Sequence, residues 1–146
     1  MYKEMLATCC CIIFSTAAFA DICPTVKSIK SGKTHNWKAY DSDDDKPLSA
    51  LRTAKFRNNI SQFSIAEWSN SGKKGTIHCY YSNNDGSTLE AYFARDHYQP
   101  NTKSRYWYQV TGLLQCAAGA DKCDFVPAPM TDKKKRLAEN DTEVLS

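Results

Sequence analysis

Several signatures of common protein classes are missing from this 146-residue sequence. It has no H-E-x-x-H zinc motif and no G-x-S-x-G nucleophile motif, which argues against a metalloprotease or an α/β-hydrolase. Its apolar run, Met5–Ala18, is shorter than the roughly 20 residues that span a bilayer. The net charge of +3 is too small to indicate nucleic-acid binding. We therefore predict a non-enzymatic protein without a cofactor, without a nucleic-acid partner and without membrane insertion after signal cleavage.

The N-terminal segment is typical of a secretory signal peptide. Lys3 precedes the apolar run, and residues 18–20 read Ala-Phe-Ala, an A-x-A cleavage site. We expect residues 1–20 to be removed, so that a periplasmic or secreted chain begins at Asp21. Two alternatives stay open: a buried N-terminal helix, and a lipoprotein box in which Cys9 would be acylated.

The cysteine count predicts a disulfide framework. Cys9, Cys10 and Cys11 fall in the predicted signal peptide, and an even number remains in the exported chain: Cys23, Cys79, Cys116 and Cys123. Cys116 and Cys123 enclose a short loop with a glycine at its tip, well suited to closure. That leaves Cys23 to pair with Cys79. A bridge between Cys79 and Cys116, on neighbouring strands, is the alternative.

Alternating apolar and polar residues predict one mainly β domain over residues 21–130, an antiparallel meander forming a small sandwich or open barrel. Residues 21–47 are expected to be irregular, and Pro47–Arg57 is the one helical candidate. The charged residues 131–146 are expected to form a flexible tail. The predicted strands are 62–68, 76–81, 88–94, 105–111 and, near the end, 124–127.

The turn Asn83–Ser87 predicts how two of these strands pair. A three-residue loop with Gly86 in a left-handed G1 bulge keeps apolar residues on one face. This register pairs Ile77 with Phe93, Cys79 with Ala91 and Tyr81 with Leu89. On the opposite face it pairs His78 with Tyr92 and Tyr80 with Glu90.

That opposite face is the candidate binding surface. Flat aromatic side chains on a rigid sheet can stack on sugars, bases or the side chains of a partner at low entropic cost. The alternative is that a second layer, such as Ala50–Asn58, covers this face and makes it core. The candidate ligand-binding residues are His78, Tyr80, Glu90, Tyr92 and Trp107.

An acidic segment, Asp41–Asp45, begins like an EF-hand calcium loop. Lys46 stands where that loop needs glycine, and Arg52 where it needs glutamate. The three histidines lack the spacing of zinc ligands. We therefore predict no metal site.

Short segments along the chain resemble a family of small exported bacterial proteins of unknown function. The resemblance covers about residues 22–126 and implies a periplasmic or secreted β domain, with no catalytic residues to carry over. It lies in Cys23-Pro24, Phe63…Ala66, Cys79-Tyr80-Tyr81, Cys116 and Cys123-Asp124-Phe125.

Together these features predict a binding or accessory module of the bacterial envelope that contacts a protein or glycan through its aromatic face. The alternative is a secreted inhibitor or effector-like factor acting on host or competitor proteins. A hydrolase is the least favoured interpretation.

Overall fold

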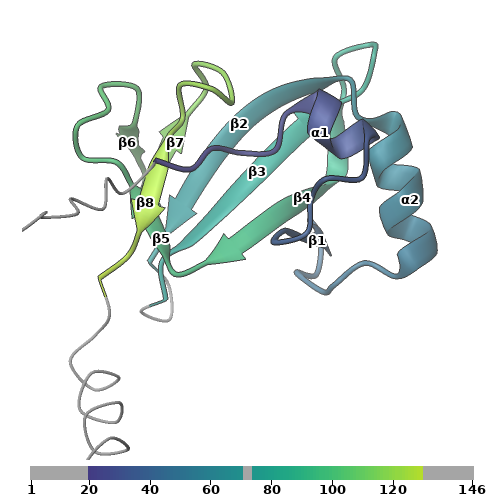
Figure 1. The fold of residues 1–146 in the computed structure, drawn as a ribbon, viewed down its shortest axis with the longest axis horizontal. Coiled ribbons are helices and arrows are strands. Elements are labelled where there is room, and N and C mark those ends of the chain that lie inside the picture. The colour runs from purple at the N-terminus through teal and green to yellow at the C-terminus, as the bar shows by residue number, and fades with distance from the viewer. Residues whose placement is uncertain (1–19, 71–73, 130–146) are drawn as a thin grey trace, which may run out of the picture.

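The computed structural model describes residues 20–70 and 74–129. Within them, a six-stranded sheet of order β1-β4-β3-β2-β7-β6 is backed by two helices and a β5–β8 ribbon (Figure 1). The helices are α1 (Val26–Lys30) and α2 (Ala50–Asn59). The strands are β1 (Lys38–Asp41), β2 (Gln62–Ser69), β3 (Thr76–Ser82), β4 (Thr88–Asp96), β5 (Tyr98–Pro100), β6 (Tyr108–Val110), β7 (Leu113–Cys116) and β8 (Phe125–Pro127).

The predicted fold class is confirmed, since the strands pair antiparallel in an open sheet. The strands predicted at 62–68, 76–81, 88–94 and 124–127 correspond to β2, β3, β4 and β8. The predicted helix is present as α2. It begins after Ser49, whose hydroxyl accepts a hydrogen bond from the Arg52 amide (3.3 Å) and so caps the first turn.

Two segments differ from the prediction. Residues 21–47 are not irregular, because they contain α1 and β1. Thr25 caps α1, and β1 exists through its pairing with β4, in which Ala39 lies opposite Phe93. The strand predicted at 105–111 is reduced to β6, which ends where Thr111 and Gly112 take positive φ in a tight turn to β7.

The pairing of β3 with β4 also differs from the predicted register. Gly86 is left-handed (φ +86°), as predicted, and Ser82 lies opposite Thr88. An irregularity between Tyr80 and Ser82 then shifts the pairing, so that Tyr80 lies opposite Tyr92. The predicted pairs Ile77–Phe93, Cys79–Ala91, His78–Tyr92 and Tyr80–Glu90 are therefore wrong, because each residue of β3 up to Tyr80 lies opposite a residue two positions later in β4 than predicted. Because the shift is by an even number of residues, His78, Tyr80 and Tyr92 share the face opposite Tyr81 and Phe93, as predicted. Glu90 falls within the irregularity and does not join them.

The core lies on the inner face of the sheet, which α1, α2 and residues 21–25 cover. Phe56 of α2 packs on Phe93 of β4 with ring centroids 5.2 Å apart. Tyr81 of β3 is fully buried, and its hydroxyl donates to the Pro24 carbonyl (2.6 Å). The sheet residues of this inner face are Ala39, Ala66, Ile77, Cys79, Tyr81 and Phe93.

The disulfides are Cys23–Cys79 and Cys116–Cys123, the favoured pairing. The first ties the segment before α1 to the centre of β3, and the second closes the loop between β7 and β8. Disulfides are typical of oxidising, extracytoplasmic compartments. The predicted signal peptide lies outside the described residues except for Ala20, and so does the predicted tail. Among the described residues, no helix is long and apolar enough to cross a membrane.

Candidate functional site

The sheet face opposite the helices, here called the outer face, holds two rows of side chains. One row runs from Tyr40 through Tyr92 and Tyr80 to Ile65, since these residues are cross-strand partners. The next row contains His78, Glu67, Gln115 and Tyr108. Period-two alternation of the strands places every one of these side chains on the side away from Phe93 and Tyr81.

Aromatic rings form a continuous group on the outer face. The Tyr40 and Tyr92 rings are stacked, with centroids 5.7 Å apart and planes inclined by 16°. The ring centroid of Tyr92 lies 5.3 Å from that of Tyr80 and 4.8 Å from that of His78. Tyr92 is thus the centre of the group, and the other three rings surround it.

Burial separates the members of this group. Tyr92, predicted as a ligand contact, is only 4% exposed, and its hydroxyl donates to a carboxylate oxygen of Asp45 (2.8 Å). It is therefore a support beneath the surface. Tyr40, Tyr80 and His78 are half-buried and keep accessible edges. Within the aromatic group, these three rings are the ones that a partner can contact.

A polar pair adjoins the rings. Glu67 lies opposite His78 on β2 and accepts a hydrogen bond from the Gln115 side-chain amide (2.6 Å). Tyr80 also hydrogen-bonds to Glu67. A carboxylate held by two neighbours has a fixed direction, which lets it select a ligand by hydrogen bonding or charge.

Burial sets the protonation states of this face. It lowers the pKa of His78, although the neighbouring Glu67 carboxylate works in the opposite direction, so the imidazole is neutral at pH 7. Burial raises the pKa of Tyr80 and of Tyr92 well above the usual range. The carboxylates of Glu67 and Asp45 add to this effect at Tyr80, and that of Asp45 at Tyr92. The tyrosines therefore stay protonated and act as hydrogen-bond donors.

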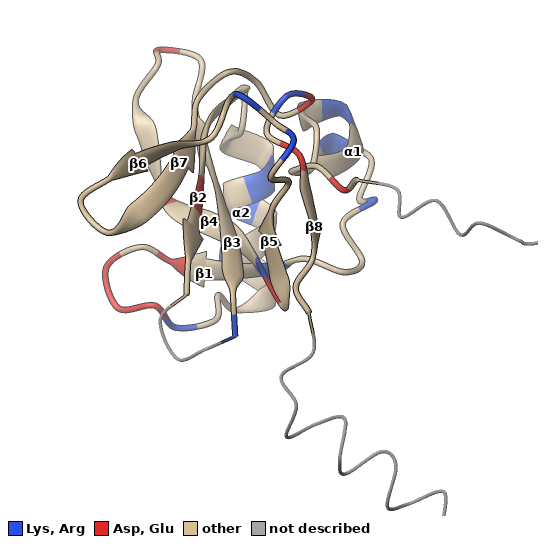
Figure 2. Cartoon of the chain, turned by 90° about the vertical axis from the view of Figure 1, so that its left-hand side faces the viewer, with Lys and Arg blue, Asp and Glu red and all other residues tan. Residues whose placement is uncertain are grey.

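The acidic segment Asp41–Asp45 flanks the outer face at the β1 edge, where Figure 2 shows it in red. Asp41 is buried and paired with Arg52. The Asp43 backbone amide and then Arg52 lower the pKa of Asp41. Asp44 pairs with Lys46 (2.8 Å). These carboxylates turn toward different partners and do not converge on one point. The segment makes the surroundings of the tyrosines acidic.

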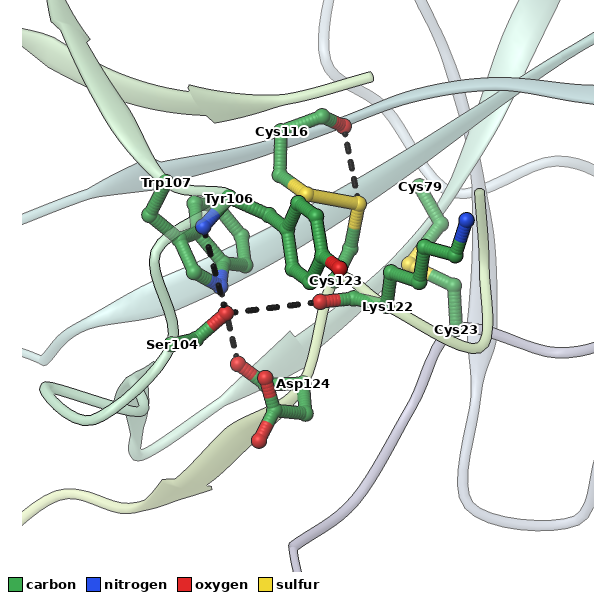
Figure 3. Close-up of a disulfide and its surroundings, with 9 residues drawn as sticks. All are labelled: Cys23, Cys79, Ser104, Tyr106, Trp107, Cys116, Lys122, Cys123 and Asp124. Atoms are coloured by element: carbon green, nitrogen blue, oxygen red, sulfur yellow. Dashed lines mark hydrogen bonds between the residues drawn. A yellow bond between two sulfur atoms is a disulfide. The ribbon is translucent and has the colours of Figure 1, made fainter. Parts of the chain in front are cut away.

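Two predicted site residues lie elsewhere. Glu90 is exposed and lines a hollow of about 360 Å³ beside α2, together with Arg52 and Lys55. Trp107 packs against the core and donates to the Asp124 carbonyl (2.8 Å), next to the Cys116–Cys123 bridge (Figure 3). Neither side chain belongs to the aromatic group.

The structure adds residues that the sequence prediction missed. Glu67 lay within a predicted strand, and period-two alternation from His78 would have placed it on this face once the strand pairing was known. Tyr40 gave no such signal, because β1 is short and its pairing partner, Tyr92, is far away in sequence.

A separate polar hollow of about 500 Å³ lies between α1, the end of α2 and the β3–β4 turn. Its lining includes Lys30, Asn59, Asn84 and Asp85, with no aromatic side chain. It offers hydrogen-bonding groups but no stacking surface.

The chain matches no family model, no curated protein and no solved structure. The resemblance to a family of small exported bacterial proteins stays a prediction.

Proposed function

We propose that this protein is an exported binding module of the bacterial envelope that holds a basic segment of a partner protein on its outer face. The observation that carries the proposal is the group of half-buried rings, Tyr40, Tyr80 and His78, beside the oriented carboxylate of Glu67. The rigid sheet beneath fixes the rings before binding, so little conformational entropy is lost.

The chemistry of the surface favours a cationic side chain. Aromatic faces attract Lys and Arg, and a carboxylate nearby adds a charge-assisted hydrogen bond. Glu67 supplies that carboxylate, and the Asp41–Asp45 segment adds negative charge at the edge. A bare phosphate backbone would be repelled by the same groups.

A neutral glycan is the second candidate. The Gln115–Glu67 pair beside Tyr80 combines a donor, an acceptor and a stacking ring. This is the arrangement that a sugar needs, with hydroxyl groups bonded at the edge and an apolar ring face covered. A secreted inhibitor would use the same face on a host or competitor protein.

The test is binding of the full, oxidised chain to arrays of basic peptides, neutral peptides and neutral glycans. Stacking is worth roughly 1–3 kcal/mol, so Tyr80→Ala should weaken binding about ten-fold or more. Glu67→Gln should weaken binding of basic peptides most. Glu90→Gln is the matched control, since it removes the same charge from an exposed site away from the rings. Equal loss in Glu67→Gln and Glu90→Gln would refute the assignment.

A further inference from the structure

The two helices carry cations without carboxylates. α1 and α2 contain no Asp or Glu, and Lys33 lies three residues after the end of α1. Figure 2 shows blue segments on both helices. Arg52 is neutralised by Asp41. Within residues 20–70 and 74–129, no ion pair involves the other cations of this layer. These are Lys27, Lys30, Lys33, Lys55 and Arg57.

Part of this charge forms a stripe that also contains an apolar side chain. Leu51 and Lys55 are one turn apart on the exposed side of α2, and Leu51 is 82% exposed. Asn58 continues the same side, and its carbonyl accepts a hydrogen bond from Lys30 Nζ (2.5 Å). The Lys30 ammonium of α1 therefore lies at the end of the α2 stripe.

A hollow with an apolar floor borders the stripe. Leu48, Phe56 and Leu89 line it, with Arg52 and Lys55 among its charged groups. Glu90 is also part of this lining, so the hollow itself is not purely cationic. Lys55 shares this hollow with Glu90, whereas Lys27, Lys30 and Lys33 are not part of its lining.

We propose that this helical face docks on an anionic lipid membrane, with the lysines at the headgroups and Leu51 in the interface. Anionic lipids attract clustered Lys and Arg side chains, and apolar side chains gain by entering the boundary with the acyl chains. A soluble polyanion would use the lysines but would leave Leu51 in water, so the membrane explains both features. The helices and the outer face lie on opposite sides of the sheet. Docking through the helices would leave the rings free for a partner.

The experiment is co-sedimentation of the full, oxidised chain with phosphatidylcholine vesicles that contain or lack phosphatidylglycerol. We expect binding to the anionic vesicles only, falling with added salt as the charges are screened. Each lysine should contribute about five-fold, so the triple variant Lys27→Gln/Lys30→Gln/Lys55→Gln should bind about a hundred-fold more weakly. Lys38→Gln/Lys74→Gln/Lys103→Gln is the control, since it removes equal charge from exposed sites outside the helices.

Leu51→Ala separates the lipid from a soluble polyanion. It should lower binding to the vesicles without changing binding to dextran sulfate. Circular dichroism of each variant checks that the fold is intact. The proposal is overturned by equal binding to neutral vesicles, by an equal loss in the control triple variant, or by vesicle binding that Leu51→Ala leaves unchanged.

Discussion

Tyr80 and Tyr81 are adjacent residues of one strand with opposite environments. Tyr81 points into the inner face, is fully buried and donates its hydroxyl to the Pro24 carbonyl. Tyr80 points to the outer face, is half-buried and meets Glu67 and Tyr92. Both faces of the sheet are rich in aromatic residues. The inner face is core because α2 covers it, and the outer face has the acidic Asp41–Asp45 segment at its edge.

The two sides of the molecule also differ in charge. All charged residues of the helices that cover the inner face are Lys or Arg. The outer face carries Glu67 and is bordered by the acidic segment Asp41–Asp45. A net charge of +3 conceals this separation. A small total charge can therefore accompany two surfaces that suit oppositely charged partners.

The largest effect is expected from emptying the inner face. Phe93→Ala should lower the free energy of unfolding by about 3–5 kcal/mol, because Phe93 is fully buried against Phe56 and Tyr81 and its removal leaves a cavity. Chemical denaturation of the oxidised chain measures this. Loss of less than about 1 kcal/mol would mean that the inner face is not the principal core.

Removing disulfides should distinguish the centre of the inner face from the edge of the sheet. Cys23–Cys79 has a sequence separation of 56 and Cys116–Cys123 one of 7. By the loop-entropy relation, replacing the first pair with alanine should cost about 4 kcal/mol and replacing the second about 2–3 kcal/mol. Thermal unfolding of the two double variants gives the order, and the reverse order would contradict this account.

Substitutions of Tyr92 should lower the free energy of unfolding less than Phe93→Ala does, although both side chains are buried. Tyr92→Phe keeps the ring and loses only the hydrogen bond to Asp45, which should cost about 1 kcal/mol. Urea denaturation of the variant measures the change. Tyr92→Ala should fall between Tyr92→Phe and Phe93→Ala. A loss in Tyr92→Ala equal to that in Phe93→Ala would make the outer face a second core.

The smallest effect concerns the pH dependence of stability. Burial lowers the pKa of His78 from 6.5, so the unfolded chain takes up this proton more readily than the folded chain. The contribution of neutral His78 is present above pH 6.5 and is lost as the pH falls through the lowered pKa. An NMR titration gives the pKa of His78, and the unfolding midpoint measured as a function of pH should fall over the same range. The variant His78→Gln should lose this part of the pH dependence. A His78 pKa above 6.5 would reverse the sign.

The sequence was sufficient for β2, β3, β4 and β8, and for assigning the tyrosines and Phe93 of β3 and β4 to their faces. Alternation in residues 76–81 and 88–94 separated Tyr80 and Tyr92 from Tyr81 and Phe93, and this division held despite the register shift. Alternation repeats every two residues, so a two-residue shift leaves it unchanged. For the same reason it could not reveal that Tyr80 lies opposite Tyr92 in place of Glu90.

What the sequence could not supply depends on contacts between distant residues. β1 is stabilised by β4, and its Tyr40 stacks on Tyr92. The burial of Tyr92 depends in part on Asp45, which lies 47 positions earlier. Trp107 lies in a segment whose alternation predicted a strand. Its indole N–H donates to the Asp124 carbonyl, and this hydrogen bond keeps the Trp107 side chain near the Cys116–Cys123 bridge. Neither local propensity nor periodicity can predict contacts between residues that are so far apart in the sequence.

Tyrosine accessibility tests the central claim most directly. Hydroxyl-radical footprinting of the full, oxidised chain, read by mass spectrometry, compares neighbouring residues within one peptide. We predict that Tyr40 and Tyr80 are oxidised readily, that Tyr81 is protected, and that a bound partner protects Tyr40 and Tyr80 further. Equal protection of Tyr80 and Tyr81 in the free protein would contradict an open outer face.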